Sequence, residues 1–98
     1  MIDGVYVCRD GLLRLTLQGH AGAAPRGEDL VCAAATALCY ALAVTLEEPL
    51  VLSLEPGLAD IAAPATHTAR IAFRTVVNGL ELLEGEYPDC IRIEELSQ

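Results

Sequence analysis

The chain has 98 residues, a length typical of one domain with a modest hydrophobic core. Its net charge of −8 opposes attraction to a phosphate backbone, so we do not expect direct contact with nucleic acid. Apolar residues make up 53% of the chain, but it holds only one Phe, three Tyr and no Trp. A core built mainly from small aliphatic side chains gains from a partner surface, and we therefore expect an oligomer.

The sequence predicts a cytoplasmic protein. It contains no run of about 20 apolar residues that could span a membrane. Its start, MIDGVYVCRDGLL, has neither the basic segment nor the long apolar segment of a secretory signal. The cysteines should therefore be reduced thiols. They lack the paired spacing of zinc ligands, so we expect no metal and no other cofactor. These four residues are Cys8, Cys32, Cys39 and Cys90.

The first predicted element is a β-hairpin. Apolar and polar residues alternate from Asp3 to Cys8 and from Leu12 to Gln18, as on the two faces of a strand. Asp10-Gly11, between them, tolerates the positive φ angles of a tight turn. Gly19 and His20 follow, and they should lie where the second strand ends.

A loop and a long helix are predicted next. Residues 21–28, AGAAPRGE, contain two glycines and a proline, which favour a loop. From about Asp29 to Leu46 there is neither Gly nor Pro, and many residues are strong helix formers. This helix is apolar on nearly every side. It must therefore be covered by the sheet and by a second helix or another subunit.

The second half of the chain predicts a further hairpin. Short apolar runs at Leu50–Leu54 and Leu58–Ala63 flank the turn residues Glu55-Pro56-Gly57.

A second helix and a last strand complete the predicted order. Thr66 or Thr68 can cap an amphipathic helix, and Gly85 is placed to end it. Alternation returns at Cys90–Glu94. The order ββαββαβ predicts a single α+β domain over residues 1–98, with its helices packed on a mixed or antiparallel sheet.

Cys32 and His20 are the residues best suited to catalysis. Cys32 falls in the first turn of the predicted helix, where unpaired N–H groups and the helix dipole favour a thiolate. His20, at the end of a strand, can take a proton near neutral pH and is joined to Cys32 by a glycine-containing loop. The alternative is that Cys32 is a small buried side chain. That interpretation is the one we adopt for Cys39, Cys8 and Cys90.

Three other polar residues are candidates for a supporting role. Asp29, three residues before Cys32, would orient His20, stabilise its protonated form or cap the helix. Thr36, one turn after Cys32, either offers its hydroxyl to the site or bonds back to a helix carbonyl. His67, at the start of the second helix, is a solvated or capping residue and the fallback base.

Three glycines, Gly19, Gly22 and Gly27, bracket the predicted loop. Loops of small residues beside a nucleophile commonly close over substrate or present backbone N–H groups to an oxyanion. An ordinary surface loop has the same composition, so both interpretations stay open. We group the three as a candidate substrate loop.

The stretch from Gly19 to Ala34 resembles a known signature. Gly19-His20-Ala21-Gly22, followed by GEDLVCAA over residues 27–34, is similar to the GHAG…GxDIVCAA pattern of the ribosomal-processing cysteine protease family Prp. The spacing from histidine to cysteine matches, and the predicted elements follow the family's order along the whole chain. Two departures occur. Thr36 stands where relatives usually have Ser, and the segment from Ala23 to Arg26 lacks the family's common aromatic residue.

This resemblance implies a function. It implies a bacterial, cytoplasmic cysteine protease that removes the N-terminal extension of a basic large-subunit ribosomal protein, and it implies a homodimer. By position, His20 would be the general base and Cys32 the nucleophile, with Asp29 and Thr36 as supporting residues. The altered segment from Ala23 to Arg26 leaves the cleavage-site specificity unpredicted.

Two hypotheses from other classes compete with the protease. One is a non-catalytic acidic dimeric module that binds a basic ribosomal protein, with Cys32 buried in its core. The other is a redox-sensing protein in which Cys32 forms a sulfenic acid or a mixed disulfide.

Overall fold

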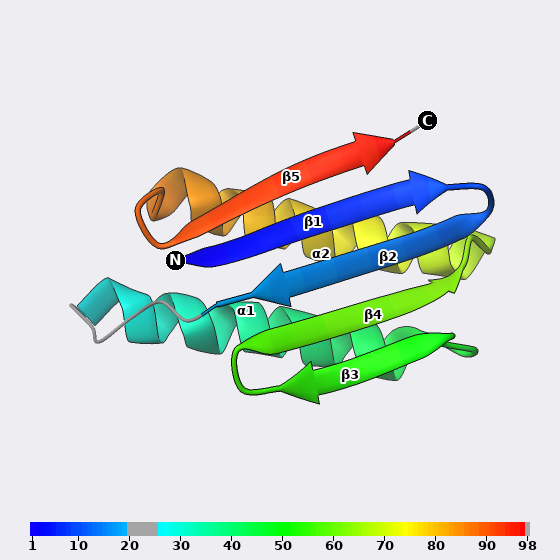
Figure 1. Ribbon diagram of the computed structural model, residues 1–98, viewed down its shortest axis with the longest axis horizontal. Coiled ribbons are helices and arrows are strands. Elements are labelled where there is room, and N and C mark those ends of the chain that lie inside the picture. The colour runs from blue at the N-terminus through cyan, green and yellow to red at the C-terminus, as the bar shows by residue number, and fades with distance from the viewer. Residues whose placement is uncertain (20–25, 98) are drawn as a thin grey trace.

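A mixed β-sheet covered on one face by two helices forms the framework of the molecule (Figure 1). The computed structural model describes residues 1–19 and 26–97, with the backbone alone at residues 26–29 and 97. The observed order confirms the predicted ββαββαβ arrangement and the α+β class. In chain order the elements are β1 (Ile2–Arg9), β2 (Leu12–Gln18), α1 (Arg26–Thr45), β3 (Val51–Glu55), β4 (Leu58–Pro64), α2 (His67–Glu86) and β5 (Ile91–Ser97).

The strands lie in the order β3-β4-β2-β1-β5. All neighbours are antiparallel except β1 and β5, which are parallel because α2 carries the chain back across the sheet. The β1–β2 hairpin turns at Asp10 and Gly11, whose φ angles of 51° and 75° confirm the predicted Asp-Gly turn. As a result, the C-terminal end of β2 and the β3–β4 turn meet at one end of the sheet.

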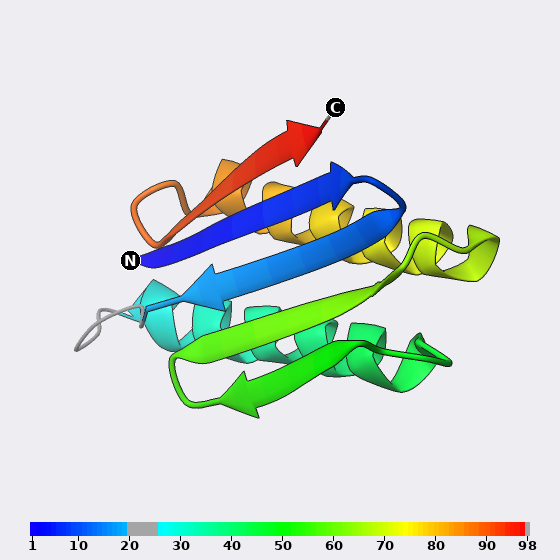
Figure 2. The same cartoon turned by 45° about the vertical axis from the view of Figure 1, so that its right-hand side comes forward.

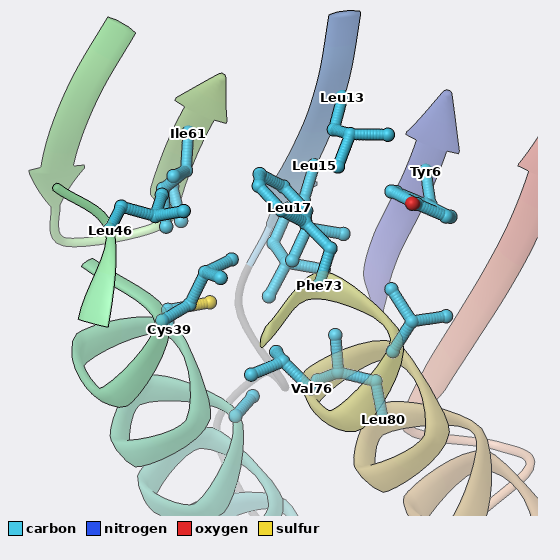
Figure 3. Close-up of a cluster of buried hydrophobic side chains, with 14 of the residues drawn as sticks. Tyr6, Leu13, Leu15, Leu17, Cys39, Leu46, Ile61, Phe73, Val76 and Leu80 are labelled. Atoms are coloured by element: carbon cyan, nitrogen blue, oxygen red, sulfur yellow. The ribbon is translucent and has the colours of Figure 1, made fainter. Parts of the chain in front are cut away.

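The core lies between the sheet and the two helices, which share one face in both views (Figures 1 and 2). Leu13, Leu15 and Leu17 of β2 point toward this layer, and all three are buried. Opposite them, Phe73 of α2 is fully buried and stacks on Tyr6 with ring centroids 5.8 Å apart. Figure 3 shows this cluster filling the space between the layers.

The first helix begins earlier than predicted, and this changes the context of several candidate residues. It starts at Arg26, three residues before the expected Asp29. Gly27 is therefore helical and not part of a loop, and Asp29 lies inside α1 and is not its N-cap residue. Cys32 comes six residues after Arg26, about 9 Å along the helix axis, so it is not in the first turn as predicted.

The second helix starts as predicted but ends later. Thr66 is its N-cap residue, and the Thr66 hydroxyl accepts a hydrogen bond from the backbone N–H of Ala69 at 3.1 Å. The prediction that Gly85 ends this helix is wrong, since α2 continues to Glu86. The helix stops at Tyr87 because Pro88 follows it, and a residue before proline is disfavoured in helical conformation.

Neither helix among the described residues combines the length and the apolar character needed to span a membrane.

Candidate active site

A cleft of about 350 Å³ lies where α1 faces the end of β2 and the β3–β4 turn. This is the end of the sheet at which β2 finishes and α1 begins, on the left in Figure 1. Cys32, Thr36 and Tyr40 line it from α1, each four residues after the last, so they share one side of the helix. From the sheet side it is lined by Ile2, Leu17, Gly19, Leu54, Glu55, Pro56, Gly57, Leu58 and Ala59.

Cys32 is half-buried and packs against the core while lining the cleft. Cys32 lies six residues after the start of α1. The helix dipole stabilises a thiolate only within the first turn, so it does not favour ionisation of Cys32. The geometry keeps Cys32 reachable by a substrate.

Cys39 is a contrasting thiol on the same helix. It is only 2% exposed, and burial raises the pKa of its thiol to about 11. Its sulfur lies among the core side chains in Figure 3. This confirms the prediction that Cys39 belongs to the core, and it leaves Cys32 as the more accessible of the two thiols near the cleft.

Thr36 is exposed and lines the cleft one helical turn after Cys32. The hydroxyls of Thr45 and Thr75 donate to the carbonyls of Ala41 and Ile71, four residues earlier in their helices. No such bond to a described residue is made by Thr36. Its hydroxyl is thus free to face a substrate.

Gly19 ends β2 in a conformation that requires glycine. Its φ angle of +106° is in the left-handed region, and a side chain there would run into the carbonyl oxygen of Met1. Its N–H donates to the carbonyl of Gly57 at 3.0 Å, which ties the end of β2 to the β3–β4 turn. Gly19 therefore has a structural role at the wall of the cleft, and His20 is the next residue of the sequence.

Several predicted site residues lie outside the described residues. These are His20 and Gly22, together with the altered segment up to Pro25. Asp29 and Gly27 are placed in α1 by their backbone.

His67 is too distant to act as the fallback base. It begins α2, just after Pro64, and Pro64 pairs with Leu12 at the start of β2. The cleft lies at the other end of these strands, where Leu58 pairs with Gln18. Seven residues of strand separate the two ends by roughly 20 Å. The interpretation of His67 as a solvated residue agrees with its exposure.

The wall that the second hairpin contributes to the cleft was not predicted from the sequence. Glu55-Pro56-Gly57 was recognisable as a turn, but its position against α1 depends on the pairing of β4 with β2, which are 40 residues apart. Tyr40, 53% exposed at the cleft, was likewise not singled out. Its spacing of four residues from Thr36 was the signal in the sequence, because residues four apart lie on the same side of a helix.

Metal ligands are not grouped in the part of the chain that the structure describes: no three His, Cys, Asp or Glu side chains there could hold an ion together.

A half-buried cysteine at a cleft, on a helix packed against a mixed sheet, fits the site of a thiol peptidase. A family model described as cysteine protease Prp matches residues 1–92, and the chain belongs to this family. The protein is therefore a cysteine protease, as the resemblance of the His20 to Cys32 stretch implied.

Solved structures support the same relationship. The essential ribosomal processing protease Prp from S. aureus, in complex with a substrate peptide, has a TM-score of 0.76 and 25% identity, covering 97% of this chain and 99% of that chain. Its complex with a covalently linked product peptide has a TM-score of 0.75 and 26% identity, and again covers 97% of this chain and 99% of that chain. SMU.848 from Streptococcus mutans has a TM-score of 0.77 and 25% identity, covering 100% of this chain and 96% of that chain. A search of curated proteins found none that matches.

Proposed function

We propose that this protease matures a ribosomal protein, by removing the N-terminal extension of a basic large-subunit protein in the bacterial cytoplasm. The observation that carries the proposal is the Cys32 thiol at a cleft in a chain of the Prp family. The S. aureus relative is a ribosomal processing protease solved with a substrate peptide. The net charge of −8 favours encounter with a basic protein.

The proposed chemistry is acyl transfer. His20 takes the proton of the Cys32 thiol, and the thiolate attacks the scissile carbonyl carbon. Backbone N–H groups stabilise the oxyanion, and protonated His20 gives its proton to the leaving amine. Water then hydrolyses the thioester and frees Cys32. The covalently linked product peptide of the S. aureus relative supports a covalent step of this kind.

His20 is proposed as the base because its neighbour in the sequence, Gly19, lies at the cleft. Gly19 lines the cleft, is held by its hydrogen bond to Gly57, and is bonded directly to His20. Thr36 is proposed to support the site through its exposed hydroxyl, one turn from Cys32. Asp29 keeps its proposed role as the carboxylate that orients His20 or stabilises its protonated form. Gly22 and Gly27 flank the segment that would cover a substrate.

A cleavage assay tests this function. The substrate is a peptide that spans the extension junction of the cognate ribosomal protein, and the variants are Cys32→Ala and His20→Ala. We expect each variant to lose at least about a thousandfold in kcat/KM with an unchanged circular dichroism spectrum. Cys8→Ala is the matched control, since Cys8 is also half-buried but lies near the far end of β1, and it should retain activity. Full processing by Cys32→Ala would instead favour the non-catalytic module.

We further propose that the protease is a homodimer joined through the outer face of α1. Along this face runs a continuous row of exposed apolar residues, which a monomer would leave in water. Val44, 82% exposed, and Leu30, 58% exposed, are its largest members. The row consists of Leu30, Ala33, Ala37, Ala41 and Val44.

Sedimentation of paired variants tests the dimer. Val44→Lys should convert the dimer to a monomer at micromolar concentration, because a charge on each copy would be buried at the contact. Leu82→Lys is the matched control, since Leu82 is 73% exposed but lies on α2. It should leave the dimer intact. A wild-type chain that sediments as a monomer would rule the proposal out.

A further inference from the structure

The cleft beside Cys32 is largely apolar and contains one carboxylate. Among its described lining residues, Glu55 is the only one with a charge, and the sheet-side wall around it is built from aliphatic side chains such as Leu54 and Leu58. Glu55 is exposed, and it forms no ion pair or hydrogen bond with a described residue. By contrast, Asp60 is held by Arg14 and Glu95 by Arg74. The carboxylate at the cleft is thus available to an incoming cation.

The backbone that carries Glu55 is rigid. Glu55 is the first residue of the β3–β4 turn, in which Pro56 has its φ angle fixed by its ring and Gly57 has a φ of +77°. Glu55 pairs with Leu58 across this turn, and the Gly57 carbonyl accepts the N–H of Gly19. Because the backbone is already held, only the Glu55 side chain has to be ordered when a partner binds.

We propose that Glu55 is a specificity-determining residue that selects a lysine or arginine beside the scissile bond of the substrate. This inference rests on the proposed function. The apolar wall receives an uncharged side chain next to Cys32, and the Glu55 carboxylate accepts charge-assisted hydrogen bonds from the basic side chain at the rim. The same carboxylate repels an acidic residue in that place, so it selects by rejection as well as by attraction.

A set of matched peptides tests this inference. Each peptide spans the extension junction and carries Lys, Ala or Glu at one position flanking the scissile bond, and kcat/KM is measured for each. At one position we expect the wild-type enzyme to prefer Lys over Ala by about two- to fivefold, the range for an exposed ion pair. Glu55→Gln should abolish this preference, and Glu55→Lys should shift it toward the Glu peptide. Raising the ionic strength should weaken the wild-type preference.

Glu48→Gln serves as the control variant. Glu48 is also an exposed glutamate that loses one charge, but it precedes β3 at the strand's other end and does not line the cleft. It should keep the full Lys preference. If Glu55→Gln keeps that preference too, or if the wild-type enzyme cleaves all peptides equally, the inference about Glu55 is wrong while the protease function stands. If the wild-type enzyme cleaves none of them, both fail.

Discussion

The two helices of this protease have the same length and cover the same face of the sheet, yet they differ in almost every other respect. Each has 20 residues. α2 is strongly amphipathic: it buries Phe73 and Leu80 and is capped by Thr66. α1 buries Val31 and Leu42 together with small side chains such as Ala35 and Cys39, and its outer face remains apolar. We infer that α2 mainly stabilises the fold, whereas α1 carries the site.

Small side chains on α1 have a direct consequence for the site. Cys32, Ala35 and Cys39, which α1 presents to the cleft, are small enough to leave space against the sheet that larger side chains would fill. The helices also approach closely where Gly79 of α2 faces Leu38, since a side chain at residue 79 would meet the Leu38 methyl group at 3.0 Å. We infer that α2 fixes α1 in place, and that α1 is thereby free to present Cys32.

The largest expected effect tests α2 as the stabilising helix. Phe73→Ala should lower the free energy of unfolding by about 3–5 kcal/mol, because the ring is fully buried and stacks on Tyr6. Denaturation with urea measures it. Ile71→Ala, on the same helix but 55% exposed, should change stability far less. Equal losses in the two variants would contradict the assignment of the buried face.

The next effect compares the two thiols of α1. Burial raises the pKa of Cys39 to about 11, so at pH 8 its thiolate fraction is about a hundredfold below that of a free cysteine with the ordinary value of 9.0. Iodoacetamide should therefore modify Cys32 well before Cys39 in the folded protein. Peptide mass mapping assigns the sites, and in urea the two should react alike. Faster labelling of Cys39 would contradict the prediction that Cys32 is the more reactive thiol.

A smaller effect is expected at the start of α2. Thr66→Ala should cost about 1 kcal/mol of stability, because the Ala69 N–H would lose the hydroxyl that accepts its hydrogen bond. Thr68→Ala is the paired control, an exposed threonine two residues further along. Thermal unfolding distinguishes the two. A neutral Thr66→Ala would show that packing of the buried face alone holds this helix.

The smallest effect concerns the link between α2 and β5. Arg74 donates to Glu95 at 2.7 Å, and this hydrogen bond lowers the pKa of the Glu95 carboxyl below its usual 4.5. A lowered folded pKa adds stability above about pH 4.5, and that stability is lost as the pH falls through the folded value. The pair is exposed, so we expect less than about 1 kcal/mol. In Glu95→Gln, the free energy of unfolding should fall less steeply as the pH is lowered below about 4.5. An unchanged dependence on pH would show that the pair contributes nothing to stability.

Local patterns in the sequence were sufficient to predict the elements of this fold. Alternation over Leu12–Gln18 predicted β2 with its observed bounds, and the cap of α2 was narrowed to two threonines, Thr66 and Thr68, of which Thr66 is the N-cap residue. The start of α1 was misplaced because Pro25 and Gly27 favour a loop in isolation, whereas packing of the helix against the sheet overrides such weak preferences. Glu55 was read only as a turn residue, since its place at the cleft depends on long-range strand pairing.

The hydrogen bond between Gly19 and Gly57 fixes the backbone directly after β2. Val31 of α1 is fully buried, which fixes the chain again twelve residues later. A connecting sequence between two fixed positions can be replaced without disturbing the rest of the fold. A chimera that keeps His20 but takes residues 21–25 from a relative should fold unchanged and differ only in the peptides it accepts.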